Sequence, residues 1–138
     1  MNGKVLVTGC SGLVGTHTAN KLVEKGYEVI GVDIKTSKFL PTTNFEFHQM
    51  DLRDADDVSV LFDQFKFNGV INAFGIKGSP IRVKERPIEY LEPSLKVNMN
   101  ITDNCVKHNC WLVYMSSVGV YQPAEVFVED TVWSTFPS

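Results

Sequence analysis

Residues 8–15 carry three glycines at fixed spacing, in the string Thr-Gly-Cys-Ser-Gly-Leu-Val-Gly. A short apolar run typical of a buried strand, Lys4–Thr8, precedes this string, and Gly12–Lys25 then reads as a helix. Glycines at such a turn let an anion approach the N–H groups at a helix N-terminus, where the helix dipole favours negative charge. The spacing therefore indicates a phosphate-binding loop, although an ordinary turn can also hold three glycines.

Strand-like segments recur along the rest of the chain. They are expected at Tyr27–Val32, Phe45–Met50, Gly69–Ala73 and Trp111–Met115. Between them, the strongest helical signal begins at Asp54, a candidate N-cap, and has apolar residues at i, i+3, i+4 and i+7. These helical positions are Val58, Leu61, Phe62 and Phe65. The alternation predicts an α/β fold with a doubly wound parallel sheet, Rossmann-type, of about five strands.

The later part of the chain gives a less regular pattern. Gly78–Pro93 contains three prolines and is expected to be a loop with a short helical turn. Ser94–His108 has helical spacing, and Ser116–Ser138 is expected to be irregular. In the helix Ser94–His108, the apolar stripe Leu95, Met99 and Val106 is expected to face the sheet. A second apolar set, Val97, Ile101 and Cys105, is expected to point elsewhere.

Composition narrows the class of protein. At 138 residues the chain fits a single domain, 1–138, and 13 basic against 16 acidic residues without a basic cluster argue against nucleic-acid binding. No apolar run approaches the length of a signal-peptide core or a membrane span. The three cysteines lack CxxC spacing, which argues against a metal site or disulfide framework and suits a cytoplasmic protein.

An acid, Asp33, ends the second expected strand, eighteen residues after Gly15. In dinucleotide-binding sheets an acid at about this distance binds ribose hydroxyls, although a carboxylate at a strand end is also often only solvated. With Asp33, the TGxxGxxG spacing resembles the short-chain dehydrogenase/reductase superfamily. Gly12-Leu13-Val14-Gly15 resembles its extended branch, the NAD-dependent epimerase/dehydratase family, whose members modify nucleotide sugars.

The resemblance implies a binding site for NAD. Its pyrophosphate would lie on the backbone of Ser11–Val14. The cofactor-binding residues of the whole glycine loop would be Gly9, Ser11, Gly12, Leu13, Val14 and Gly15. Asp33 and Ile34 would hold the adenosine ribose, and the carboxylate would repel the 2′-phosphate of NADP. NAD is therefore expected rather than NADP, although Lys35 is close enough to attract that phosphate.

Two further strings extend the resemblance. Asp51-Leu52 matches a pair that contacts the adenine, although Asp51 can also belong to a helix cap with Asp54. Asn72–Lys77 resembles the end of the family's fourth strand, which lies along the cofactor. The resemblance implies contacts from Ala73, Phe74, Gly75 and Lys77, although an exposed lysine is usually only solvated.

Two strings lie where the nicotinamide half would bind. Asn98–Thr102 resembles the family's Asn-Val-x-Gly-Thr and implies that Asn98 lies near the nicotinamide, although a solvated asparagine on a helix is the alternative. Val113–Tyr121 resembles the family's Ser-Ser-x-x-Val-Tyr-Gly. It implies a cofactor contact from Ser116 and a catalytic Ser117, although serines also form turns.

The family's reaction is hydride transfer, in which a Tyr-x-x-x-Lys pair removes a hydroxyl proton. That pair is expected just past Ser138, so the chain as given should bind a dinucleotide without catalysing. The resemblance implies an epimerase, dehydratase or reductase of nucleotide sugars; the alternative is a non-catalytic NAD-binding module. It also implies a homodimer through the helix Ser94–His108, unless the loop around Pro80–Pro93 covers its apolar surface.

Overall fold

Five parallel strands form the single sheet of the chain in a computed structural model that describes residues 2–117, 120–121 and 124–132. The strands are β1 (Lys4–Thr8), β2 (Glu28–Asp33), β3 (Phe45–Gln49), β4 (Gly69–Asn72) and β5 (Trp111–Tyr114). Their order is β3-β2-β1-β4-β5, with β1 paired to β2 on one side and to β4 on the other. The chain thus winds outward from β1 in one direction and returns to continue in the other, which makes the sheet doubly wound.

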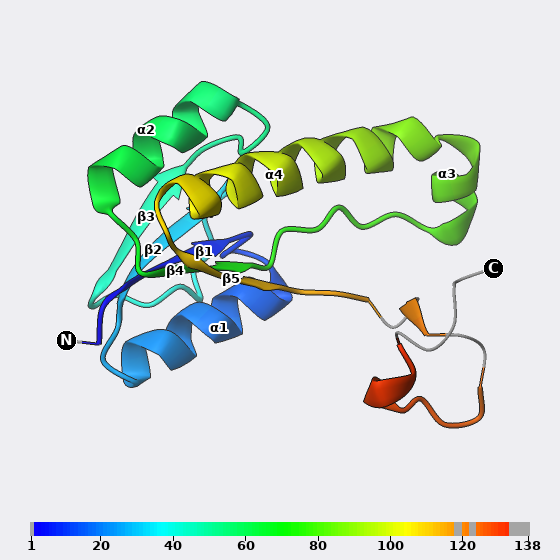
Figure 1. Cartoon of the computed structure of the whole chain (residues 1–138), viewed down its shortest axis with the longest axis horizontal. Coiled ribbons are helices and arrows are strands. Elements are labelled where there is room, and N and C mark those ends of the chain that lie inside the picture. Colours follow the sequence, from blue (N-terminus) through cyan, green and yellow to red (C-terminus); the bar gives the residue numbers. More distant parts are fainter. Residues whose placement is uncertain (1, 118–119, 122–123, 133–138) are drawn as a thin grey trace.

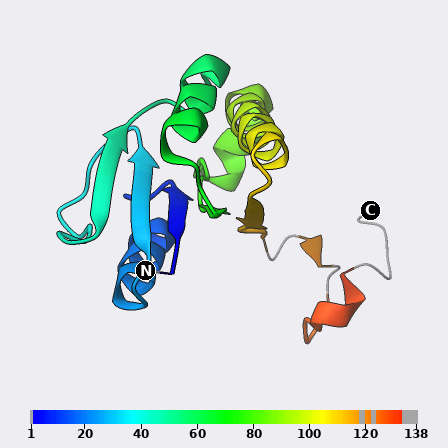
Figure 2. The same cartoon turned by 60° about the vertical axis from the view of Figure 1, so that its left-hand side comes forward.

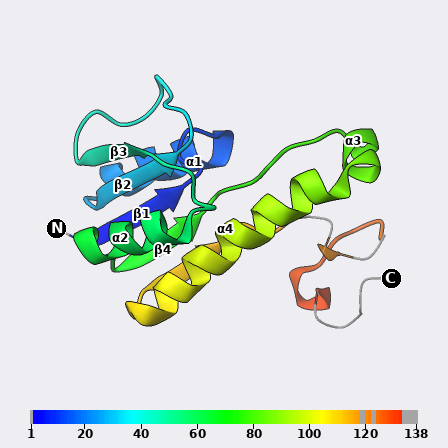
Figure 3. The same cartoon turned by 90° about the horizontal axis from the view of Figure 1, so that it is seen from above.

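Helices cover both faces of this sheet. Helix α1 (Leu13–Glu24) lies on one face, and α2 (Ala55–Phe65) and α4 (Pro87–Lys107) lie on the other (Figure 1). The short α3 (Pro80–Glu85) precedes α4, whose first turns project with it beyond the sheet (Figure 3). The described part of the chain after β5, which includes a 3₁₀ turn at Glu129–Thr131, extends away from the sheet (Figure 2).

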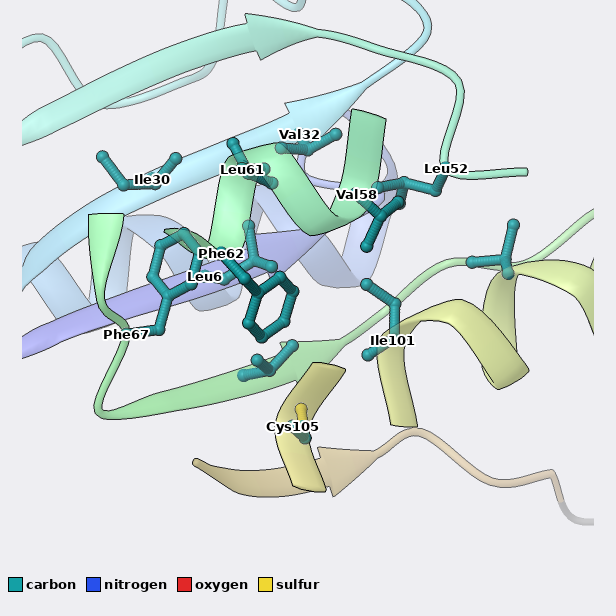
Figure 4. Packing of buried hydrophobic residues seen from close by; sticks show 12 residues of the cluster. Leu6, Ile30, Val32, Leu52, Val58, Leu61, Phe62, Phe67, Ile101 and Cys105 are labelled. Carbon is teal, nitrogen blue, oxygen red and sulfur yellow. The ribbon is translucent and has the colours of Figure 1, made fainter. Parts of the chain in front are cut away.

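The core lies on the face that α2 and α4 cover. Leu6 of β1, Phe62 of α2 and Ile101 of α4 are fully buried there, and Figure 4 shows them packed between the sheet and the two helices. Each such side chain stabilises the fold by about 1.5–3 kcal/mol relative to an exposed one. A smaller cluster around Val7 and Val29 packs under α1. Successive strand residues point to opposite faces, which explains the unbroken apolar runs of β1 and β2.

The α/β fold expected from the sequence is confirmed, and every expected strand lies within one residue of its expected ends. Helix α1 begins after the N-cap Gly12 and ends at the C-cap Lys25. Helix α2 begins after Asp54, whose side chain accepts hydrogen bonds from the N–H groups of Asp56 and Asp57. These N–H groups lack acceptors within the helix, so Asp54 acts as an N-cap.

The short helical turn expected within Gly78–Pro93 is present as α3, but the expectation that the rest is a loop is wrong, because residues 87–93 form the first turns of α4. Two of its prolines, Pro80 and Pro87, begin helices, where the missing N–H group costs no hydrogen bond. Ser79 caps α3 by accepting from Arg82 N. Pro93 lies inside α4 and removes one helical hydrogen bond, but it is buried, so packing offsets part of that loss.

The expected orientation of α4 is also wrong. Val97, Ile101 and Cys105 face the core, whereas the stripe expected to do so is exposed. The exposed fractions are 51% for Leu95, 63% for Met99 and 76% for Val106. Both sides of this helix carry apolar residues, so spacing alone does not decide between them.

Polar side chains beside the buried stripe fix the orientation. Asn100 Nδ2 donates to the carbonyl oxygens of Leu52 at 2.9 Å and of Arg53 at 3.1 Å. Asn98 Oδ1 accepts from Asn72 Nδ2 at 2.8 Å. All three hydrogen bonds form with the face of Ile101 against the sheet.

Candidate cofactor-binding site

The carboxyl ends of all five strands meet at one edge of the sheet, because the strands are parallel. The glycine loop follows β1, Asp33 ends β2, and residues 73–77 follow β4. Residues 115–117 follow β5 at the same edge. Nearly all the candidate site residues therefore come from segments that the fold brings together, at the place where open α/β sheets bind ligands.

The glycine loop turns tightly between β1 and α1. Gly9 has φ +61°, and Gly12 N donates to Gly9 O at 3.0 Å. A Cβ at Gly15 would lie 2.1 Å from Gly9 O, so only glycine allows α1 to lie this close to the end of β1. The N-cap Gly12 has no side chain to accept from the first turn of α1, and that turn contains no acidic residue. The helix N-terminus is therefore suited to an external anion.

Asp33 ties the end of β2 to this loop. Its Oδ2 accepts from Ser11 N at 3.1 Å, and its Oδ1 accepts from Lys35 N at 3.3 Å. Both carboxylate oxygens are thus held by backbone N–H groups, which fixes the side chain at the edge of the sheet. A carboxylate oxygen can accept more than one hydrogen bond, so the group can also receive ligand hydroxyls.

A cleft of about 310 Å³ opens between these segments. Nine residues expected at the cofactor site line it: Gly9, Gly12, Asp33, Ile34, Asp51, Leu52, Ala73, Phe74 and Gly75. Met50 and Ile76 also line it, although the sequence analysis did not single them out. Their apolar side chains adjoin expected residues, which is the one signal that could have indicated them.

Asp51 lies at the cleft rather than in the helix cap. The Arg53 guanidinium donates to both carboxylate oxygens of Asp51. The backbone N–H of Arg53 also donates to Asp51 Oδ1, at 3.0 Å. The hydrogen bond from the Arg53 guanidinium lowers the pKa of Asp51 below its usual value, so the group is ionised near neutral pH. Asp54 alone caps α2, and Asp51 contributes only its carbonyl oxygen, which accepts from Asp54 N at 3.1 Å.

A second hollow, of about 340 Å³, continues along the same edge and shares Phe74, Gly75 and Ile76 with the cleft. The expected residues Asn98, Ser116 and Ser117 line this second hollow, together with Ser94, Tyr114, Met115 and Val120. Residues 118, 119 and 122 of the expected serine motif lie outside the described part of the chain. The two hollows form a path from Asp33 to Ser117.

Five expected residues line neither of these two hollows. Ser11 and Leu13 line a separate hollow on the other side of the glycine loop, with His17 and Phe39. Val14 is exposed in the first turn of α1, and the exposed Lys77 lines none of these hollows. Gly15 is buried behind the loop.

Sequence reasoning also missed three polar side chains that connect to the expected Asn98 at this edge, namely Thr8, Asn72 and Tyr114. Asn72 is buried at the end of β4 and forms hydrogen bonds with Thr8 and Asn98, and Asn98 in turn contacts the hydroxyl of Tyr114. A polar residue in an otherwise apolar strand was the available signal for Asn72. Thr8 and Tyr114 gave none, because each residue type is common at strand ends.

Over residues 2–117, 120–121 and 124–132, no cluster of three or more His, Cys, Asp or Glu side chains is arranged to hold a metal ion. In the same part of the chain, no helix combines the length and apolar character that a membrane crossing needs.

Comparisons with known proteins agree on one family. The model of the NAD dependent epimerase/dehydratase family matches residues 5–137. UDP-glucose 4-epimerase of Pisum sativum is 35% identical to this chain over an aligned length of 143 residues, gaps included. The alignment covers 92% of this chain and 41% of that protein. The solved UDP-glucose 4-epimerase of Thermus thermophilus, in complex with NAD, has a TM-score of 0.80 and 29% identity, over 98% of this chain and 44% of that one. The chain therefore spans less than half the length of these relatives.

Proposed function

The chain belongs to the NAD-dependent epimerase/dehydratase family, and we propose that it is the dinucleotide-binding portion of an enzyme that modifies a nucleotide sugar by hydride transfer. The observation that carries the proposal is the continuous path along the carboxyl edge of the sheet. The glycine loop and Asp33 lie at one end of this path and Ser117 lies at the other. Relatives named as UDP-glucose 4-epimerases support the substrate class.

The backbone of the glycine loop fits a pyrophosphate. Ser11 N and Gly12 N already have acceptors, Asp33 Oδ2 and Gly9 O. We therefore assign phosphate binding to the N–H groups of Leu13 and Val14, which begin α1 and have no side-chain cap. Their side chains are exposed, so the contribution of these two residues comes from their backbone.

The adenosine half fits the cleft beside Asp33. Its ribose hydroxyls would donate to the carboxylate, and the adenine would lie between Ile34 and Asp51-Leu52. A 2′-phosphate would bring a second negative charge against Asp33, which favours NAD over NADP. Phe74 and Gly75 would border the rest of the cofactor, since they line both hollows.

The nicotinamide half fits the second hollow, next to Asn98 and Ser116. NAD would supply the hydride acceptor. Ser117 would hold the reacting sugar hydroxyl by a hydrogen bond, because it lies in the same hollow. For a cofactor contact from the Lys77 side chain, the only support is the resemblance to the family, because Lys77 lines neither hollow.

We further propose that residues 1–138 form one cytosolic domain that associates as a homodimer through the outer face of α4. This face consists of Ile88, Leu91, Leu95, Met99 and Val106. All five side chains are more than half exposed, and they lie on the side of α4 opposite its buried residues. An exposed apolar stripe on one helix is suited to a two-fold contact with its own copy.

Titration calorimetry with NAD and NADP tests the cofactor assignment. The unmodified chain should bind NAD more tightly than NADP. Asp33→Ala should weaken NAD by about 1–3 kcal/mol, the range for hydrogen bonds to a charged group, and should reduce the discrimination. A chain that already prefers NADP would show that the role assigned to Asp33 is wrong. Asp63→Ala, at an exposed acid of α2 outside both linings, is the matched control and should bind as the unmodified chain does.

A further inference from the structure

A series of hydrogen-bonded side chains crosses the edge of the sheet beside the second hollow. Thr8 Oγ1 donates to Asn72 Oδ1, and Asn72 Nδ2 donates to Asn98 Oδ1 at 2.8 Å. Asn98 Nδ2 then donates to the hydroxyl oxygen of Tyr114 at 3.3 Å. The four residues come from β1, β4, α4 and β5, so the series joins four elements.

The backbone sets the direction of these hydrogen bonds. Phe74 N, which can only donate, lies 3.4 Å from Asn72 Oδ1. The oxygen of the Asn72 amide must face this N–H group, so its Nδ2 faces Asn98. Asn98 therefore turns its oxygen toward Asn72 and its Nδ2 toward Tyr114.

Burial makes this arrangement costly to change. Thr8 and Asn72 are 0% and 1% exposed, and a buried amide that loses its partners is strongly disfavoured. Asn98 is only partly buried, and without Asn72 its amide could turn over and present its oxygen. Buried Asn72 thus determines whether Asn98 presents its Nδ2 or its oxygen toward Tyr114.

We propose that Asn72 is a positioning residue that holds Asn98 and Tyr114 as hydrogen-bond donors for an oxygen-bearing ligand group in the second hollow. Asn98 Nδ2 has a second hydrogen, and the Tyr114 hydroxyl has one of its own. Both residues line the hollow. The inference rests on the proposed function, since the carboxamide of the nicotinamide supplies such an oxygen.

Asn72→Asp tests this role at constant size. Aspartate still accepts from Thr8 and Phe74, but it cannot donate to Asn98, so the Asn98 amide should turn over. Affinity for NAD should fall about tenfold, the effect of losing one to two hydrogen bonds. Affinity for ADP-ribose, which lacks the nicotinamide, should stay within about twofold of the unmodified value, because the adenosine cleft is unchanged.

Asn104→Asp is the matched control, because Asn104 is also a buried asparagine but lines neither hollow. Its ratio of NAD to ADP-ribose affinity should equal that of the unmodified chain. Equal losses for both ligands in Asn72→Asp, or no loss for NAD, would overturn the positioning role. If Asn72→Asp does not fold, Tyr114→Phe removes only the hydroxyl and should lower NAD affinity alone; an unchanged NAD affinity in that variant would overturn the role equally.

A measurement without ligand separates this inference from the proposed function. An unmodified chain that binds neither NAD nor ADP-ribose would refute the function. In the free protein, the side-chain amide signals of Asn98 in ¹⁵N NMR spectra should move in Asn72→Asp and stay in place in Asn104→Asp. Asn98 signals that do not respond to Asn72→Asp would overturn the inference whatever the ligand results.

Discussion

An alanine at Gly15 should mainly weaken folding, whereas an alanine at Gly12 should mainly weaken cofactor binding. A Cβ at Gly15 would lie 2.1 Å from Gly9 O and 2.7 Å from Gly9 C. These are backbone atoms of the turn, so α1 must move away from β1. A Cβ at Gly12 meets only Gly9 O, at 3.2 Å, and its φ of −76° suits any residue.

The two substitutions should therefore differ in their effect on the free energy of unfolding. Gly15→Ala should lower it by about 3 kcal/mol, the upper part of the range for overpacking, because the clash is with backbone. At roughly 3 °C per kcal/mol for a chain of this size, Tm falls by about 10 °C. Gly12→Ala weakens the N-cap by about 1 kcal/mol. It also restricts the unfolded chain, a gain of about 0.4–1 kcal/mol, so the net change is within about 0.5 kcal/mol.

For NAD affinity the order should be reversed, with the larger loss in Gly12→Ala. Gly12 lines the cleft, so its methyl group narrows the proposed phosphate path, and affinity for NAD should fall at least about tenfold. Folded Gly15→Ala should lose less affinity than Gly12→Ala, because its methyl group lies behind the loop and does not line the cleft. Urea denaturation and titration calorimetry measure the two quantities. Equal destabilisation by both substitutions, or NAD affinity unchanged in Gly12→Ala, would refute the roles assigned to the two glycines.

Two further predictions concern the outer face of α4 and the thiols. Leu95→Glu should turn a dimer into a monomer in light scattering, with little change in stability. Val97→Glu, on the buried face, should instead prevent folding. If the unmodified chain is a strict monomer at high concentration, the proposed contact is contradicted. Burial raises the pKa of Cys10 to about 11 and of Cys105 to about 12, so a thiolate-specific reagent at pH 8 should label Cys110 first. Because these pKa values are raised in the folded state, the stability they contribute is present below pH 9 and is lost as pH rises toward 11. Rapid labelling of Cys10 at pH 8 would show that the thiol is not buried.

The sequence predicted the sheet because its strong signals were local. Apolar runs marked β1 and β2, and the spacing from Val58 to Phe65 marked α2. The residues lining the cleft were expected from the resemblance to the family, and the fold brings them together because the ends of parallel strands meet at one edge.

The errors arose where local patterns were ambiguous. Prolines suggested a loop before Ser94, but two of them occupy first helical positions and the third is buried in α4. Helix α4 is apolar on two sides, and its orientation depends on tertiary hydrogen bonds: Asn98 accepts from Asn72, and Asn100 donates to Leu52 O. Such contacts, like the series from Thr8 to Tyr114, depend on tertiary structure and leave no periodic signal.

The central claim is that a dinucleotide binds along the carboxyl edge of the sheet, and mapping NAD onto the backbone by ¹⁵N NMR tests it most directly. A saturable titration should shift the N–H signals of Leu13, Val14 and Gly75, with Asn98 following in the second hollow. Signals of Asn44 and Glu46, at the hollow beside β3, should not move. The absence of saturable shifts, or shifts confined to residues away from this edge, would contradict the account.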